Sequence, residues 1–430
     1  MKVAVIALGK IGLPLAVQIA SKGHEVVGAD TSQSAVDLIN AGTPTFPGET
    51  DLDSKLVEVV AAGRLVAMTD TSEAVDRSEA VVVVVPLMTD GAGTPDFSAM
   101  DAATRDIAAG LNPGTLVSYE TTLPVGTTRS RFLGMLEDLT GLEGGSGFFL
   151  VHSPERVFSG RIFSDLRRYP KLVGGIDEES TKRGVEFYEA ILDFDERPDL
   201  PRPNGVWAME SVEAAELAKL AETTYRDVNI ALANEFARFA EGASIDISEV
   251  IEASNSQPFS HIHRPGVAVG GHCIPVYPRF YLEGDPDARV VRTAREVNDS
   301  VPRRVASVVV DALDEGGDHR VLILGVAYRG GVKETAYSGA FALRDALLEM
   351  GVSPVADDPM YDAAELRQAG FEPWDGEPVD AVIVQADHKE YKELLPSNFP
   401  GVRVVYDGRA ILQRENWDVD GLSVKVIGRG

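Results

Sequence analysis

The sequence predicts an α/β protein in which two doubly wound domains, each with a parallel sheet, flank a helical domain. Three observations support this fold class. Short β-branched runs alternate with amphipathic helices near the N-terminus, a long helical stretch without strands occupies the middle, and the alternation returns near the C-terminus. Such alternation is typical of parallel sheets that are covered by helices on both faces.

The first domain is predicted to span residues 1–200. Its pattern predicts strands at residues 3–8, 25–29, 80–85, 115–119 and 148–151, with helices at 13–21 and 34–41. A proline-rich stretch at residues 197–203 marks the connector that ends this domain.

The central domain is predicted to span residues 201–302 and the third domain residues 303–430. Helical spacing covers residues 211–241 and 247–253, and a helix this long often forms a subunit interface, so a homodimer is expected. The third domain is predicted to contain strands at 320–324, 353–356, 381–385 and 403–406 and a helix at 339–350. Its loop 326–334 stands where the first domain has a glycine-rich turn, so internal duplication has weak support.

Composition excludes several classes of function. The 430 residues carry 40 Lys and Arg against 67 Asp and Glu, a net charge of −27. This charge repels nucleic acid and anionic lipid, so we expect neither as a partner. The longest apolar run, residues 80–87, is too short for a membrane helix, which needs about 20 residues. Residues 1–7 enter a strand directly and lack a signal-peptide pattern, so we expect a cytoplasmic protein.

A dinucleotide-binding turn is predicted after the first strand. Gly9 would let the backbone approach a pyrophosphate, and Gly12 would allow close packing of helix on strand, with Lys10 and Ile11 between them. Asp30 ends the second strand, where a carboxylate accepts hydrogen bonds from an adenosine ribose and disfavours a 2′-phosphate. NAD is therefore the expected cofactor of a Rossmann-like domain. The alternative is a tight packing turn without a cofactor, which Ala7 in place of the first glycine slightly favours.

The single cysteine, Cys273, lies in a glycine-rich loop. One cysteine excludes an intramolecular disulfide and a multi-cysteine metal site, and no metal is predicted. His272 and Arg264 supply nearby groups that would favour a thiolate. A buried cysteine in a Pro/Gly-rich turn is the equally weighted alternative.

Nine segments in order resemble the UDP-glucose/GDP-mannose dehydrogenase family over nearly the whole chain. They are Thr122-Leu-Pro-Val-Gly-Thr-Thr128, Ser153-Pro-Glu-Arg-Val157, Lys171-Leu-Val-Gly-Gly175, Lys219-Leu-Ala-Glu-Thr-Thr-Tyr-Arg226, Asp227-Val-Asn-Ile-Ala231, Gly270-Gly-His-Cys-Ile-Pro275, Ala294-Arg-Glu-Val-Asn298, Leu324-Gly-Val-Ala-Tyr328 and Asp407-Gly-Arg409. His272 and the stretch 226–231 resemble the UDP-N-acetylhexosamine 6-dehydrogenase branch.

The resemblance implies oxidation of a sugar C6 alcohol to a carboxylate with two NAD, through a thiohemiacetal and a thioester on Cys273. Lys219 would stabilise the oxyanion, Thr122 would hold a catalytic water and Glu155 would act as base for thioester hydrolysis. Taken without the resemblance, these three residues are a solvated helix lysine, a turn residue and an N-cap partner.

The resemblance also implies binding residues. Pro86 and Thr121 join the cofactor-binding set. The substrate-binding set is Arg156, Thr223, Arg226, Asn229, His263, Gly270, Tyr277, Tyr328, Arg329 and Arg409. The resemblance places the active site in the cleft between the first two domains, with the third closing over the nucleotide. Each arginine alone is equally consistent with a surface ion pair.

Three positions depart from the family pattern. Tyr277 replaces an Asp four residues after the cysteine, Thr223 replaces an Asn four residues after the lysine, and the segment 334–338 lacks its arginine. A tyrosine has an ordinary pKa of about 10 and does not replace a carboxylate base, so proton removal would pass through water held by Thr122 and Lys219. These departures bear on which sugar nucleotide is used.

Three alternatives stay open beside a UDP-N-acetylhexosamine dehydrogenase. One is a UDP- or TDP-glucose 6-dehydrogenase. A two-electron hydroxyacid dehydrogenase that uses the helix lysine would leave Cys273 without a role. A non-catalytic sensor of NAD or nucleotide sugar is the third.

Overall fold

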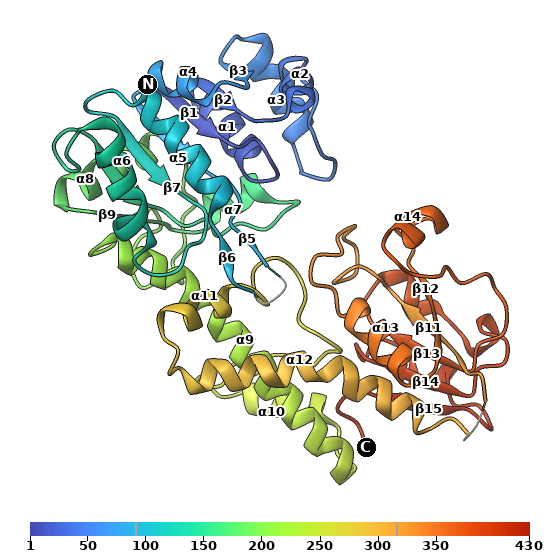
Figure 1. Cartoon of the computed structure of the whole chain (residues 1–430). Helices are drawn as coiled ribbons and strands as arrows, with labels where there is room; N and C mark the ends of the chain where they lie inside the picture. The colour runs from blue at the N-terminus through green and yellow to red at the C-terminus, as the bar shows by residue number, and fades with distance from the viewer. Residues whose placement is uncertain (91–92, 315–316) are drawn as a thin grey trace. The chain divides into compact units, whose positions relative to one another are not determined.

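The computed structural model in Figure 1 describes residues 1–90, 93–314 and 317–430. Contacts divide the chain into two compact units, Met1–Ala221 and Glu222–Gly430. The domain boundaries at residues 200 and 302 stay a prediction.

The first unit contains, among its described residues, an eight-stranded sheet in the order β10-β9-β8-β7-β4-β1-β2-β3. Its strands are β1 (Lys2–Ile6), β2 (Glu25–Ala29), β3 (Leu65–Met68), β4 (Ala80–Val83), β7 (Leu116–Tyr119), β8 (Phe149–His152), β9 (Lys171–Gly175) and β10 (Val206–Ala208). From β3 across to β8 all neighbours are parallel, and β9 runs antiparallel to β8. The five predicted strands are confirmed, whereas β3, β9 and β10 were not predicted.

Helices cover both faces of this sheet (Figure 1). The first face carries α1 (Gly12–Ser21), α2 (Gln33–Asn40), α3 (Leu52–Ala61), α7 (Ile162–Arg168) and α8 (Glu178–Ile191). The second carries α4 (Thr71–Asp76), α5 (Ser98–Gly110), the π-helical turn η1 (Thr128–Leu133) and α6 (Gly134–Thr140). Along β1, Val3 and Val5 join the first apolar cluster, and Ala4 and Ile6 join the second. A strand that is apolar on both sides is typical of a parallel sheet between two helix layers.

The long helix α9 (Val212–Ala243) begins in the first unit and continues into the second. It is followed by α10 (Ile247–Asn255), α11 (Tyr277–Gly284) and α12 (Arg289–Val310). The predicted helices at 211–241 and 247–253 are confirmed. Helix α12 was not predicted, although its buried residues recur at the spacing of one helix face, which is the pattern of an amphipathic helix.

The second unit contains a five-stranded parallel sheet in the order β12-β11-β13-β14-β15 within the described residues. Its strands are β11 (Arg320–Leu324), β12 (Ser353–Asp357), β13 (Ala381–Val384), β14 (Val404–Asp407) and β15 (Ser423–Val426). The other elements of this unit are α13 (Gly339–Glu349), α14 (Ala363–Gln368) and the 3₁₀ turns η2 (Lys389–Glu393), η3 (Pro396–Asn398) and η4 (Arg414–Asn416). The first unit also contains the short strand pair β5 (Met88–Thr89) and β6 (Pro95–Asp96). The predicted strands and helix of this region are confirmed, and both α/β sheets match the predicted fold class.

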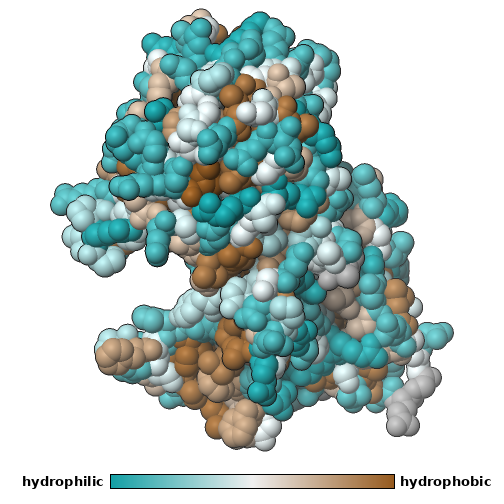
Figure 2. Space-filling view, turned by 60° about the vertical axis from the view of Figure 1, so that its left-hand side comes forward, coloured by the Kyte–Doolittle hydropathy of each residue, from teal (hydrophilic) through white to brown (hydrophobic). Residues whose placement is uncertain are grey.

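Hydrophilic residues cover most of the face shown in Figure 2, with separate hydrophobic areas between them. None of the helices in the described ranges combines the length and apolar character that a bilayer span requires.

Candidate functional site

The residues predicted to bind NAD, together with Thr122 and Glu155 of the predicted catalytic set, lie at one edge of the first sheet. Strands β1, β2, β4, β7 and β8 are parallel, so the segments that follow them emerge at the same edge. The predicted residues in these segments are Gly9, Lys10, Ile11, Gly12, Asp30, Pro86, Thr121, Thr122 and Glu155. The chain leaves β1 toward β2 on one side and reaches β4 on the other, and ligands of open α/β sheets bind at such a switch point.

The turn after β1 has the shape that its two glycines predict. A Cβ on Gly12 would lie 1.9 Å from the Ala7 carbonyl oxygen, so only glycine allows α1 to pack this closely. A Cβ on Gly9 would meet no heavy atom within 4 Å, which leaves open space beside the helix N-terminus. Ala7 adopts φ = 73°, the left-handed conformation that a glycine would supply.

Asp30 joins the turn to the second strand. Its Oδ2 accepts a hydrogen bond from the Leu8 N–H at 2.9 Å, and its Oδ1 accepts one from the Ser32 N–H at 2.9 Å. Each carboxylate oxygen can accept a second bond, so the group keeps acceptor capacity for a ribose diol. Lys10 is exposed beside the turn, and no acidic residue lies in the first turn of α1. The turn therefore fits a dinucleotide.

Two loops carry the predicted catalytic residues Thr122 and Glu155. The Thr121 hydroxyl donates to the Val85 carbonyl at 2.7 Å and ties the loop after β7 to the segment of the exposed Pro86. Thr122 is buried. The Glu155 N–H donates to the Glu120 carbonyl at 3.0 Å, which joins the loop after β8 to the end of β7. The Glu155 Oε1 accepts bonds from the N–H groups of Arg156 and Val157, and the Arg156 guanidinium donates to the Pro170 carbonyl at 3.2 Å.

A buried ion pair lies next to these loops and was not predicted. The Lys171 Nζ is 2.7 Å from the Glu120 Oε2, and the Tyr188 hydroxyl donates to the Glu120 Oε1 at 2.6 Å. Lys171 also donates to the Ser153 carbonyl at 3.3 Å. Burial raises the pKa of Glu120, and the Lys171 ammonium opposes that shift. The pair links the ends of β7 and β8 through β9. The sequence signal that could have indicated a buried pair is the presence of a Lys and a Glu, Lys171 and Glu120, beside apolar strand segments.

Lys219 and Thr223 lie one turn apart on α9, so their side chains share a helix face. Both are buried. The burial excludes the alternative of a solvated helix lysine at position 219.

The loop of Cys273 is held within the second unit. The Asn229 Oδ1 accepts from the His263 N–H at 2.9 Å, and the ring of Tyr225 meets that of His263 at 5.9 Å between centroids. The partly buried Arg226 pairs with Glu222 at 3.6 Å on the same helix. Asn229, Arg226 and His263 therefore gather on one side of α9.

Cys273 itself is partly exposed, so the alternative of a fully buried cysteine is excluded. Its carbonyl accepts from the N–H of Tyr277, the first residue of α11, at 2.9 Å. The exposed ring of His272 lies 3.4 Å from the Glu334 carboxylate. A Cβ on Gly270 would lie 2.6 Å from the Cβ of Tyr328, so the loop touches the segment after β11.

The predicted nucleotide-binding residues of the third domain follow β11 and β14. The Arg329 Nε donates to the Tyr328 hydroxyl at 3.1 Å. The Arg409 guanidinium donates to the Gln385 carbonyl at 2.5 Å and to the Tyr328 carbonyl at 3.4 Å. Burial lowers the pKa of Arg409, with Asp387 and Asp407 opposing the shift. The structure thus brings Gly270, Tyr328, Arg329 and Arg409 together.

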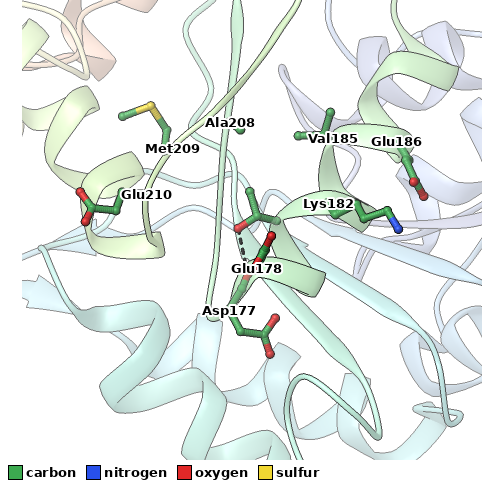
Figure 3. A pocket seen from close by; sticks show the side chains of 9 residues that line it. Asp177, Glu178, Lys182, Val185, Glu186, Ala208, Met209 and Glu210 are labelled. Atoms are coloured by element: carbon green, nitrogen blue, oxygen red, sulfur yellow. Dashed lines mark hydrogen bonds between the residues drawn. The ribbon is translucent and has the colours of Figure 1, made fainter.

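A cavity of about 520 Å³ lies away from these residues, between the start of α8 and residues 208–210. Figure 3 shows its lining, which contains Asp177, Glu178, Thr181, Lys182, Val185, Glu186, Ala208, Met209 and Glu210. The four carboxylates around one lysine would repel a diphosphate, so this cavity does not suit a nucleotide.

Profiles of one protein family match three successive stretches of the chain. The NAD binding domain of the UDP-glucose/GDP-mannose dehydrogenase family matches residues 1–192, the central domain residues 213–300 and the UDP binding domain residues 322–414. The chain belongs to this family. The predicted resemblance is confirmed, and the protein is an NAD-dependent nucleotide-sugar dehydrogenase.

Relatives agree with this assignment. A UDP-N-acetyl-D-mannosamine dehydrogenase of Pyrococcus horikoshii is 33% identical over 100% of both chains. An NDP-N-acetyl-D-galactosaminuronic acid dehydrogenase of Ralstonia nicotianae is 32% identical over 95% of this chain and 96% of its own. The solved structure of the UDP-D-ManNAc dehydrogenase from Pyrococcus horikoshii matches with a TM-score of 0.87, covering 100% of both chains. Within the described residues, no group of three or more His, Cys, Asp or Glu side chains is arranged to hold a metal.

We predict that Asp30→Ser weakens NAD binding in this dehydrogenase about tenfold and reduces the preference for NAD over NADP. The substitution removes a charged acceptor, whose hydrogen bonds contribute about 1.5–3 kcal/mol, and removes the charge that repels a 2′-phosphate. Titration of the protein with NADH and with NADPH measures both constants. Asp37→Ser, at an exposed position of α2, is the control and should match the wild type. An unchanged cofactor preference in Asp30→Ser would contradict the assignment.

His152 generates a prediction about pH. It is fully buried at the end of β8, and neither ring nitrogen has a hydrogen-bond partner in the described part of the chain. Burial, followed by the charge of Lys171, lowers the pKa of His152 to about 3. In the unfolded chain His152 binds a proton near pH 6.5, whereas in the folded chain it binds one only near pH 3. The free energy of unfolding therefore falls as the pH decreases through this window.

We expect the wild type to lose about 2 kcal/mol of unfolding free energy between pH 7 and pH 4.5 relative to His152→Leu. Thermal midpoints of the two proteins across this range measure the difference. Parallel curves would show that His152 is not buried in its neutral form.

Proposed function

We propose that this dehydrogenase oxidises the C6 alcohol of a UDP-N-acetylhexosamine to a carboxylate, in two two-electron steps at one site. The observation that carries the proposal is a single, partly exposed cysteine in a glycine-flanked loop that contacts the segment after β11, in a chain with a UDP binding domain. The choice of sugar rests on the relatives, which are named for UDP-N-acetyl-D-mannosamine and an NDP-N-acetyl-D-galactosaminuronic acid.

Cys273 supplies the covalent step. The first oxidation converts the alcohol to an aldehyde, and the thiolate then adds to the aldehyde carbon to give a thiohemiacetal. The thiohemiacetal has a C–H and a hydroxyl on one carbon, so a second hydride can leave and a thioester forms. Water cleaves the thioester to a carboxylate and restores the thiol. The turn after β1 would hold NAD, which would supply the hydride acceptor for each oxidation.

The remaining residues act on charge and protons. Lys219 stabilises the oxyanion of the hemiacetal, and its burial strengthens that interaction because water does not screen it. Thr122 holds the water that takes the first proton. Glu155 acts as base for thioester hydrolysis. Arg329 and Arg409 bind the diphosphate, since a protein with a net charge of −27 needs local cations for an anionic substrate.

A homodimer is the assembly we propose. Helix α9 exposes a stripe of four large apolar side chains whose spacing of seven, four and three residues places them on one face of the helix: Tyr225, Leu232, Phe236 and Phe239. Phe239 is 68% exposed in the single chain. Contiguous exposed apolar surface of this kind is typical of subunit interfaces.

We predict two NADH per limiting sugar nucleotide with one member of a panel of UDP-GlcNAc, UDP-ManNAc, UDP-GalNAc, UDP-glucose and TDP-glucose. Absorbance at the end of the reaction measures the ratio. One NADH per sugar would remove Cys273 from the mechanism. No turnover with any member, in a protein that still binds NAD, would favour the non-catalytic sensor.

Replacing the thiol tests the covalent step. Cys273→Ser is expected to lower the rate of carboxylate formation by about 10³-fold or more and to yield at most one NADH per sugar, because a hydroxyl is a much weaker nucleophile than a thiolate. Tyr277→Phe removes only a phenolic hydroxyl and should retain two NADH per sugar. Loss of all activity in Tyr277→Phe would instead make Tyr277 a proton carrier.

The interface is tested by Phe239→Glu, which should convert the dimer to a monomer in sedimentation equilibrium because a charge would be buried in the contact. Leu348→Glu, at an exposed position of α13, is the matched control and should remain a dimer. A wild-type monomer, or a dimeric Phe239→Glu, would refute the assignment of this stripe.

A further inference from the structure

Glu216 is a buried carboxylate to which neither the sequence patterns nor the proposed mechanism gives a role. It lies on α9, three residues before Lys219, and its side chain has no exposed surface. Its Oε2 accepts a hydrogen bond from the Gly126 N–H at 2.5 Å. Its Oε1 accepts from the Thr128 N–H at 2.8 Å and from the Thr128 hydroxyl at 2.6 Å. These donors lie at the end of the loop after β7, which contains Thr122, and at the start of η1.

The donors explain why a carboxylate is needed at this position. Thr128 is the first residue of η1, which continues directly into α6, so its N–H is one of the groups that a helical segment leaves without an internal partner. Gly126 turns the chain with φ = 89°. An acceptor with two oxygens satisfies both N–H groups, and its negative charge is favourable near a helical N-terminus. Burial raises the pKa of Glu216 to about 7, against the opposing effect of these hydrogen bonds, so the site holds the carboxylate at a cost.

The carboxylate connects two predicted catalytic residues. Glu216 and Lys219 are three residues apart on one helix and therefore lie on neighbouring parts of the same face. Thr122 lies at the start of the loop whose end Glu216 binds, and both Thr122 and Lys219 are buried. The other end of the loop is held at Thr121 by its bond to the Val85 carbonyl. The bonds to Glu216 therefore join this loop to α9 one turn before Lys219.

We propose that Glu216 is a positioning residue that fixes Thr122 relative to Lys219. The inference rests on the proposed function, in which Thr122 and Lys219 act on the reacting sugar. Glu216 touches neither substrate nor cofactor in this assignment and acts through the loop. Its loss should therefore lower the rate of the chemical steps more than the binding of either ligand, since small displacements of reacting groups cost large factors in rate.

Glu216→Gln is the decisive variant, because it keeps the size of the side chain and removes one acceptor. Whichever way the amide is turned, its NH₂ group faces a backbone N–H of Gly126 or Thr128, and two donors cannot bond to each other. Glu213→Gln is the matched control. Glu213 lies one turn earlier on α9 and bonds to the exposed Arg129 at 2.6 Å, so it joins the same two segments at the surface.

We expect Glu216→Gln to lower kcat about tenfold or more, with KM for the sugar nucleotide and Kd for NAD within about threefold of the wild type. Glu213→Gln should match the wild type in all three constants. Hydrogen exchange at the amides of Gly126 and Thr128 should accelerate in Glu216→Gln alone. A purely structural role would instead change the thermal midpoint and both ligand constants together. Wild-type kcat in a folded Glu216→Gln would overturn the proposal.

Thr128→Val covers the case in which Glu216→Gln does not fold. It removes one donor to Glu216, keeps the helix start, and should lower kcat by a smaller factor with unchanged NAD binding; an unchanged kcat would count against the proposal. The activity of the wild type separates a failure of the proposed function from a failure of the role assigned to Glu216. If it oxidises no nucleotide sugar, the proposed function fails, and unchanged exchange at Gly126 and Thr128 in the variant would still refute the role of Glu216 in holding the loop.

Discussion

Buried carboxylates that accept backbone N–H groups hold the loops on which the candidate site depends. A loop inside a protein must satisfy its peptide groups without a neighbouring strand or water, and an unpaired N–H costs about as much as a lost hydrogen bond. Glu216 satisfies the loop after β7, and Glu49 accepts from the N–H groups of Gly160 and Ile162 beyond β8. In the second unit, Asp358 accepts from Val326 and Ala327, directly before Tyr328.

This arrangement gives the acidic composition a structural meaning. A net charge of −27 suggests that the acidic side chains lie on a solvated surface, yet several carboxylates are buried. Burial raises the pKa of Glu49 and of Asp407, and hydrogen bonds from backbone N–H groups oppose both shifts. The cost of burying a charge is therefore offset by the donors that the loops must satisfy in any case. Loop conformation and carboxylate burial stabilise each other.

The sequence predicts what local patterns determine. Strands β1, β2 and β4 follow from apolar runs, and the turn of Gly9 and Gly12 follows from its spacing. Contacts between distant residues carry no such pattern. Lys171 stands in a recognisable motif, but its partner Glu120 follows another strand, and the sequence does not indicate which charged residue Lys171 pairs with. His152 and Glu216 escape prediction for the same reason. Their surroundings come from segments that meet only after folding.

The close glycine contacts of the cysteine loop bear on how such enzymes can be recombined. A side chain on Gly266 would come within 2.8 Å of Arg409, one on Gly270 within 2.6 Å of Tyr328, and one on Gly408 within 2.1 Å of Val267. The loop that contains Cys273 and the segments after β11 and β14 therefore pack so closely that these glycines leave no room for a side chain. The sequence nevertheless assigns the loop and these segments to different domains. A chimera that exchanges the third domain alone would pack the loop of one parent against the third domain of another, and the two would not be complementary in shape. Breakpoints that keep residues 262–273 with residues 322–414 from a single parent would preserve the fit.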